Sequence, residues 1–381
     1  MKILMLGCKD WPYGHSINYE MNVGGGTDKY IHNLCSKLSE KGVGIELVAR
    51  RFPGQLKEER ESNITIHRVW FIPGYFTRLP SFAFFSVLKG IMLRGQFDII
   101  HGHGLFGAVS AVVLAKILGI PCVITRHGFT IQETVKKSRR MIGMQIVLER
   151  AVTNKADKII FLSRDEHTKV ISKMKLDSDK IALIESATVI PPDLSINRVK
   201  DGEKTTVLYV GRLVNDKGLE ELVRSFPLLP EHLQKRTRYV ILGDGYLNTR
   251  LQEIITENDL SGSVQMTGFT KTPEEWYAKA DIFVLASLHE GFPIALLEAM
   301  SYGLPCIIND FGVPIPDDAV MIMPNNKPHT IAEYITRLAE NPDLREMLGM
   351  RARQLVINRF SFDRVTDEYL RLYNKLLEDK K

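Results

Sequence analysis

Two glutamates in the second half of the chain have the spacing of a ligand-binding loop and helix. In the segment DIFVLASLHEGFPIALLEAMSYGLPCII, Glu290 follows a strand-like run, and Glu298 falls about a turn and a half into the next helix. A carboxylate among apolar helix neighbours needs a hydrogen-bonding partner, which the two hydroxyls of a ribose would supply. The alternatives are an internal salt bridge for Glu298 and a helix cap for Glu290.

Cations and glycines follow two strands of the same half. In VLYVGRLVNDKGLEEL, Arg212 and Lys217 come directly after a strand and before a helix, and in RYVILGDGY Gly243 and Gly245 follow another strand. Two cations at a helix start suit a diphosphate, and glycines let a ligand approach bare backbone. Solvated loop charges are the alternative for the two cations.

A glycine triplet precedes the first helix of the chain. Gly24, Gly25 and Gly26 lead into it, with Thr27 as the expected cap. A helix N-terminus reached by bare backbone is a natural anion site, so the triplet is a candidate phosphate cradle. The alternative is a flexible turn, because glycine motifs have low specificity.

Three histidines lie at the ends of adjacent predicted strands. His101 and His103 belong to DIIHGHG, and His127 to VITRHGFT. His101 and His103 lie two positions apart at a strand end, a spacing that suggests zinc, but no third ligand is obviously arranged beside them. Contact with a sugar or acceptor is therefore favoured over a metal. The triplet DSD at 177–179 lies in a lysine-rich loop and is interpreted as a solvated turn. The sequence therefore predicts no metal site.

The positions of these residues after strand-like runs indicate two parallel sheets. The first half alternates short apolar runs with turns and helical stretches, and ligands of such sheets bind outside the carboxyl ends of the strands. The expected strands are 2–7, 44–50, 64–69, 98–103, 122–127 and 158–163, with helices starting near residues 27, 106 and 134.

A second series of strands follows the polar stretch SINRVKDGEKTT, where we expect a linker at about 195–205. Its strands are VLYVGR, RYVILGDG, SVQMTG, DIFVLA and PCIIND, with helices near 218–226, 246–258, 273–280 and 293–302. The chain ends in an amphipathic helix, FDRVTDEYLRLYNKLLEDK, with apolar residues at helical spacing.

Composition narrows the function classes. A length of 381 residues favours two domains, and 44% hydrophobic with 25% charged residues indicates an ordinary globular protein. A net charge of +5 with both signs interspersed is too mild to indicate nucleic-acid binding. Four scattered cysteines, an N-terminus without a leader and the lack of a long apolar stretch favour the cytoplasm and no membrane span.

Taken together, these motifs resemble the retaining glycosyltransferases of family four over nearly the whole chain, most specifically in HEGFPIALLEAMSYGLP. The resemblance implies the GT-B fold, in which two doubly wound, Rossmann-like α/β domains face each other and close on the substrates. It implies an acceptor-side domain at 1–197, a nucleotide-sugar domain at 203–362 and a terminal helix at 363–381 that packs back on the first domain.

The resemblance also implies a role for each matched residue. Glu290 and His127 would act at the reacting centre, and Glu298 would bind the ribose. The other implied contacts are Gly24, Gly25, Gly26, Arg212 and Lys217 with the donor diphosphate, Gly243, Gly268 and Phe269 with the ribose or base, Gly291, Phe292 and Pro293 with the sugar, and His101 and His103 on the acceptor side.

The implied reaction moves a hexose-type sugar from a nucleotide diphosphate sugar, with UDP or GDP expected, to a glycan or lipid-linked acceptor. The anomeric configuration is retained, and no metal or other cofactor is needed because fixed positive charge stabilises the leaving diphosphate. The chain departs from the family pattern at 185–192 and 309–318. Two alternatives therefore stay open, a GT-B-type sugar-nucleotide epimerase and a non-catalytic nucleotide-sugar binder.

The segment RVWFIPGYFTRLPSFAFFSVLKGIMLRG at 68–95 mixes aromatic residues with cations. Such a mixture can seat a protein on anionic lipid, so peripheral contact with the inner face of a membrane is a hypothesis for this segment. The alternative is ordinary core structure with snorkelling cations.

Overall fold

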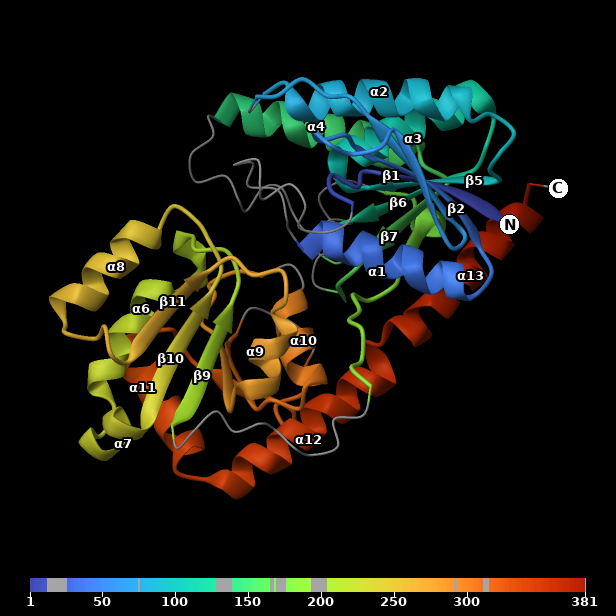
Figure 1. The fold of residues 1–381 in the computed structure, drawn as a ribbon. Coiled ribbons are helices and arrows are strands. Elements are labelled where there is room, and N and C mark those ends of the chain that lie inside the picture. Colours follow the sequence, from blue (N-terminus) through green and yellow to red (C-terminus); the bar gives the residue numbers. More distant parts are fainter. Residues whose placement is uncertain are drawn as a thin grey trace. The chain divides into compact units, whose positions relative to one another are not determined.

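The computed structural model describes residues 1–11, 26–74, 76–127, 139–164, 168, 176–192, 204–290, 293–310 and 315–380. The chain divides into two compact units (Figure 1). Unit 1 comprises Met1–Ser186 and Phe362–Lys381, and unit 2 comprises Ala187–Ser361. The first boundary comes earlier than the predicted 197, because the backbone NH of Thr188 donates to the carbonyl of Phe360 at 2.9 Å and ties this segment to unit 2. The predicted linker falls mostly on 193–203, outside the described residues.

The sheet of unit 1 is parallel except at one edge. Over the described residues its order is β3-β4-β2-β1-β5-β6-β7-β8, and only the β3–β4 pair is antiparallel. The strands are β1 Lys2–Leu6, β2 Gly44–Arg50, β3 Glu58–Glu61, β4 Ile64–Val69, β5 Ile99–His103, β6 Cys122–Arg126, β7 Lys158–Phe161 and β8 Ile181–Leu183. Strands β5 and β6 are buried at every residue, as expected of strands with helices on both faces.

Helices cover both faces of this sheet. They are α1 Gly26–Glu40, α2 Arg78–Met92, α3 Gly104–Leu118, α4 Arg139–Lys155 and α13 Phe362–Glu378. Helix α3 packs between α2 and α4 on one face, and α1 packs against the terminal helix α13 on the other (Figure 1). Helix α1 starts at Gly26, so Thr27 is its second residue and the predicted cap is wrong.

The sheet of unit 2 is parallel throughout, in the order β11-β10-β9-β12-β13-β14 over the described residues. The strands are β9 Thr205–Val210, β10 Thr237–Leu242, β11 Val264–Gly268, β12 Ile282–Leu285, β13 Cys306–Asn309 and β14 Met321–Met323. The helices are α6 Leu219–Ser225, α7 Glu231–Arg236, α8 Asn248–Glu257, α9 Glu274–Lys279, α10 Ile294–Ser301, α11 Pro328–Ala339 and α12 Pro342–Arg359. The prediction of two doubly wound α/β domains is confirmed.

In each sheet, the direction in which successive strands are added reverses once. In unit 1 the chain runs outward from β1 through β2 on one side and through β5 on the other, and in unit 2 it does so from β9 through β10 and β12. Ligands of doubly wound sheets bind at the carboxyl ends of the strands beside such a reversal. The fold therefore has two candidate crevices, one at the β1–β5 edge and one at the β9–β12 edge.

Among the helices that the structure describes, no single one combines the length and hydropathy needed to cross a membrane.

Candidate functional site

The β9–β12 edge of unit 2 brings together a lysine and a glutamate that are far apart in the sequence. Lys217 ends a short 3₁₀ helix after β9, and Glu290 follows β12. The Lys217 Nζ lies 2.9 Å from Glu290 Oε1, and the Ser287 hydroxyl donates to the same oxygen at 2.7 Å. Their side chains are only 10% and 14% exposed. Lys217 is therefore not a solvated loop charge, and Glu290 is not a helix cap.

A glycine allows the two loops to meet. Gly218 follows Lys217 with φ of 64°, and a Cβ at this position would collide with the carbonyl oxygen of Ala286. The backbone NH of Leu288 also donates to the carbonyl of Asp216 at 2.8 Å. The Lys217–Glu290 pair is thus set by rigid backbone contacts rather than by side-chain flexibility.

Arg212 lies at the same edge, directly after β9. Its side chain is exposed, and its carbonyl oxygen accepts a hydrogen bond from the Tyr209 hydroxyl at 3.1 Å. Burial, together with the negative charge of Glu290, raises the pKa of Tyr209 well above its ordinary value. Tyr209 therefore stays a neutral donor, and the edge carries its positive charge on Arg212 and Lys217.

Glycines occupy the ends of the neighbouring strands β10 and β11, so the backbone there carries no side chain. Gly243 follows β10 with φ of 142°, and a Cβ there would collide with the carbonyl oxygen of Gly211 after β9. The NH of Gly243 donates to the carbonyl of Gly268, the last residue of β11, at 2.9 Å. Phe269 follows it and is half-buried. The ends of β9, β10 and β11 are therefore joined through glycine backbone.

Glu298 lies within α10 and is 9% exposed. The Tyr277 hydroxyl donates to Glu298 Oε2 at 2.9 Å. Burial, and then the charge of Glu298, raise the pKa of Tyr277 well above its ordinary value, so the phenol remains a donor. Glu298 is therefore held in one orientation by a tyrosine from α9.

The other predicted donor contacts are only partly described. Gly26 is the exposed first residue of α1, and Pro293 is the buried residue that precedes α10. Gly24, Gly25, Gly291 and Phe292 lie outside the described residues.

In unit 1 the three predicted histidines form one cluster at the β1–β5 edge. His103 Nδ1 lies 2.9 Å from His127 Nε2, and the rings of His101 and His103 are 4.1 Å apart between centroids. His101 is hydrogen-bonded on both nitrogens, to the Thr125 hydroxyl at 2.8 Å and to the Tyr373 hydroxyl at 2.7 Å. Tyr373 belongs to α13, so the terminal helix fixes this part of the cluster.

The cluster is uncharged at neutral pH. Burial lowers the pKa of His101 to about 3, and burial together with the charge of Lys9 lowers that of His127 to about 3. Burial and the two neighbouring histidines lower the pKa of His103 well below its ordinary value. The three rings can therefore donate and accept hydrogen bonds, but they do not supply positive charge.

Within the described residues, no group of three or more His, Cys, Asp or Glu side chains is arranged to hold a metal ion. Asp177 precedes a 3₁₀ turn at Ser178–Lys180, and its Oδ1 accepts from the NH of Asp179 at 3.1 Å. The exposed turn expected at 177–179 is observed.

Several partners of the predicted residues carry no signal of their own in the sequence. Ser287 stands three positions before Glu290 and could have been found from its place after a strand. Tyr277 lies 21 positions from Glu298, and Tyr373 lies 272 positions from His101. No spacing rule connects such distant residues, so only the packed structure identifies them.

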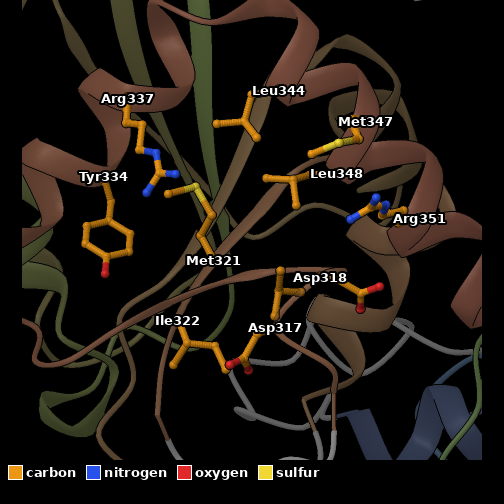
Figure 2. Close-up of a pocket in the computed structure, with 11 residues that line it drawn as sticks. Asp317, Asp318, Met321, Ile322, Tyr334, Arg337, Leu344, Met347, Leu348 and Arg351 are labelled. Atoms are coloured by element: carbon orange, nitrogen blue, oxygen red, sulfur yellow. The ribbon is translucent and has the colours of Figure 1, made fainter.

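A cavity of about 320 Å³ lies elsewhere in unit 2, beside the edge strand β14 (Figure 2). Its lining includes Met321 from β14, Tyr334 and Arg337 from α11, and Leu348 and Arg351 from α12. None of the predicted site residues lines it. The cavity is separate from the β9–β12 edge.

Comparison with known proteins gives matches over most of the chain. The family model described as "Glycosyl transferases group 1" matches residues 193–355, and the one described as "Glycosyltransferase Family 4" matches residues 24–187. An uncharacterized glycosyltransferase of Methanocaldococcus jannaschii is 26% identical over 94% of this chain and 97% of its own length. The UDP-Gal:alpha-D-GlcNAc-diphosphoundecaprenol alpha-1,3-galactosyltransferase of Escherichia coli is 26% identical over 77% of this chain and 79% of its own length.

Among solved structures, the sucrose-phosphate synthase from Thermosynechococcus elongatus superposes with a TM-score of 0.83. The match covers 100% of both chains at 20% identity, which shows a shared fold.

Proposed function

Because the chain belongs to the group 1, family-four type of glycosyltransferases, we propose that it moves a hexose from a UDP- or GDP-sugar to a glycan or lipid-linked acceptor with retention of configuration. The observation that carries the proposal is the Lys217–Glu290 pair at the β9–β12 edge, whose side chains are largely shielded from solvent. A cation beside a carboxylate, at the place where such sheets bind ligands, suits a donor that is anionic at one end and rich in hydroxyls at the other.

Each group at this edge has a proposed role toward the donor. Lys217 and Arg212 bind the diphosphate, and Glu290 accepts hydrogen bonds from the sugar hydroxyls. Glu298, held by Tyr277, binds the ribose hydroxyls. The backbone at Gly243 and Gly268 contacts the base, and a contact of Gly26, at the start of α1, with the diphosphate stays a prediction. The contacts of Gly24, Gly25, Gly291 and Phe292 stay predictions.

The proposed chemical step uses fixed positive charge instead of a metal. The bond between the sugar C1 and the departing phosphate oxygen breaks, and the acceptor oxygen takes its place on the same face. The acceptor hydroxyl proton passes to the departing phosphate. Lys217 and Arg212 stabilise the charge that develops on the diphosphate, so turnover should persist in EDTA.

The histidine cluster of unit 1 is proposed to serve the acceptor side. His127 is neutral and partly exposed, and it is oriented by His103. A neutral ring can hold an acceptor hydroxyl without repelling the oxocarbenium character of the sugar. His101 and His103 would not act as acids. They would affect the acceptor indirectly, by orienting His127.

Thermal-shift measurements with UDP-, GDP-, ADP- and TDP-sugars, followed by product analysis, test the proposal. A ligand present at a hundred times its dissociation constant stabilises by about 2.7 kcal/mol, which is easily measured. We expect one nucleotide to stabilise the protein and the sugar to reach an added acceptor. An altered sugar with free UDP and no acceptor would indicate an epimerase. Binding without any turnover would indicate a nucleotide-sugar binder.

We also propose peripheral contact with an anionic membrane through 68–95. Several large apolar side chains of this segment are exposed, namely Trp70, Ile72, Phe76, Phe84, Leu88 and Met92. Arg78, Lys89 and Arg94 lie among them, and a surface of this kind matches a bilayer with anionic headgroups. The relative from Escherichia coli is named for a diphosphoundecaprenol acceptor, which is a lipid. A membrane-bound acceptor would explain the exposed apolar face.

A further inference from the structure

Unit 1 contains a buried arginine that its described neighbours do not satisfy. Arg50 ends β2 and is 1% exposed. Its Nε, Nη1 and Nη2 make no hydrogen bond with any described residue. Burial lowers the pKa of Arg50 to about 10, so the side chain still carries its charge at neutral pH. A buried charge without hydrogen-bonding partners is strongly unfavourable, and proteins rarely keep one without a use for it.

Two aromatic rings hold the guanidinium but do not satisfy its donors. The Arg50 Cζ lies 5.3 Å from the ring centroid of Phe71 and 5.3 Å from that of Phe82. Cation–π contacts engage the charge of a guanidinium, whereas its N–H groups lie in the plane and need acceptors. The rings therefore orient Arg50 and leave its donors for an acceptor group.

A second unsatisfied group belongs to the same region. Asp28, in the first turn of α1, is fully buried, and the backbone NH of Lys9 donates to its Oδ1 at 2.7 Å. Its Oδ2 accepts no hydrogen bond from a described residue, and the Lys9 Nζ is 4.0 Å away. Of the neighbouring charges, that of Asp28 acts most strongly to raise the pKa of Arg50 against the effect of burial, and the two side chains form no ion pair within the described residues. Arg50 therefore has unused donors and Asp28 an unused acceptor among the described residues, and each side chain lies within the electrostatic range of the other.

This region is where a doubly wound sheet binds ligands. Strand β2 lies directly beside β1, and both end at the edge where the order reverses toward β5. Gly7 follows β1 with φ of 99°, and a Cβ there would collide with the carbonyl oxygen of His103. The ends of β1 and β5 therefore approach closely, and β1 separates Arg50 on β2 from the histidines of β5.

We propose that Arg50 and Asp28 form a ligand site in unit 1 for a hydroxylated phosphate, in which the guanidinium donates to the phosphate oxygens and Asp28 Oδ2 accepts from a hydroxyl of the same molecule. The planar fork of arginine matches phosphate geometry, and a carboxylate beside it selects a ligand that also carries hydroxyls. The proposal deepens the proposed function, because it identifies the acceptor as a phosphorylated polyol or sugar. The phosphate could belong to a free metabolite or to a lipid headgroup.

The test measures the binding of inorganic phosphate and glycerol 3-phosphate to the full chain by calorimetry and thermal shift. Arg50→Met keeps an unbranched side chain between the two rings and removes the donors. Arg51→Met is the matched control, because Arg51 is the next residue and is exposed. We expect Arg50→Met to weaken glycerol 3-phosphate binding about 10- to 100-fold and Arg51→Met to leave it within about twofold. Equal binding by the wild type and Arg50→Met, or no binding by the wild type, overturns the proposal.

A second variant keeps the test informative if Arg50→Met does not fold. Asp28→Asn retains the acceptor for the Lys9 NH and removes the charge. It should bring the affinity for glycerol 3-phosphate down to that for inorganic phosphate, and an unchanged preference for glycerol 3-phosphate contradicts the role of Asp28. Monomeric dihexanoyl phosphatidylglycerol is the lipid arm: tighter binding than glycerol 3-phosphate identifies a headgroup, and weaker binding identifies a free metabolite.

The failure of this proposal is separable from that of the proposed function. Arg50 is not among the residues proposed to contact the donor, so the UDP- or GDP-sugar shift should be the same in Arg50→Met and the wild type. Donor binding without phosphate binding overturns only the Arg50 site. If the donor shift also fails in the wild type, the proposed function itself is wrong.

Discussion

At the level of single residues, Lys217 forms an ion pair with Glu290, and we propose that it also binds the donor diphosphate. We expect Lys217→Met to weaken nucleotide-sugar binding about 10- to 100-fold, because the loss of a charge-assisted hydrogen bond costs about 1.4–2.8 kcal/mol. Lys235→Met is the control, since Lys235 pairs with Glu231 on the surface and its side chain is 72% exposed. Calorimetric titration of the donor into both variants measures the difference. Similar affinities in the two variants would remove Lys217 from the donor site.

His101 makes unit 1 sensitive to acid. Its pKa is about 3 in the folded protein and about 6.5 in an unfolded chain, so between these values only the unfolded state binds the additional proton. The free energy of unfolding therefore falls as the pH falls below about 6.5, by about 1.4 kcal/mol per pH unit for this residue. His101→Gln removes this contribution, and we expect a shallower decline.

Urea unfolding at pH 7, 6 and 5 measures both slopes. The variant removes one imidazole and leaves His103 and His127 in place, so part of the acid sensitivity should remain. Parallel declines for the variant and the wild type would mean that His101 is charged, or accessible, in the folded state.

At the level of elements, the strand ends of unit 2 are joined through glycines. Gly243 has φ of 142°, and a side chain there would meet the Gly211 carbonyl. We expect Gly243→Ala to cost about 1–3 kcal/mol of stability and to weaken nucleotide binding, because the β9 and β10 ends must separate. Gly262→Ala is the control, since nothing lies within 4 Å of its added Cβ. A Tm equal to that of the control would show that the loop yields without strain.

Elements also differ in how well the sequence predicts them. The strands β2 and β4 have the expected bounds, because isoleucine and valine recur in both and each is followed within a few residues by a proline and a glycine. Strand β3 was not predicted, because EERE is charged and exposed at every residue and is defined only by its antiparallel pairing with β4. Strand β14 has three residues, too few for a period to be recognised.

At the level of the whole molecule, helix α2 exposes several large apolar side chains, among them Phe84 and Met92. Met92 is 75% exposed in α2, whereas Met350 is 61% exposed in α12 of unit 2. If α2 contacts a membrane, Met92→Ser combined with Phe84→Ser should reduce cosedimentation with anionic phosphatidylglycerol vesicles severalfold, because buried apolar area sets interfacial affinity. Met350→Ser should have no effect. If the wild type does not bind the vesicles, α2 is excluded as a membrane contact. An equal reduction of binding in the double variant and in Met350→Ser would also exclude it.

The sequence alone determined the two parallel sheets and the edges where chemistry is expected. Apolar runs of strand length followed by glycine, lysine or histidine are local signals, so Lys217, Glu290 and the three histidines could be assigned to strand ends before any contact was known. The tertiary structure decided which groups meet. It paired Glu298 with Tyr277, paired His101 with Tyr373 of the terminal helix, and left Arg50 buried between two rings without a described hydrogen-bonding partner. These outcomes depend on packing between segments far apart in the chain, which no local pattern encodes.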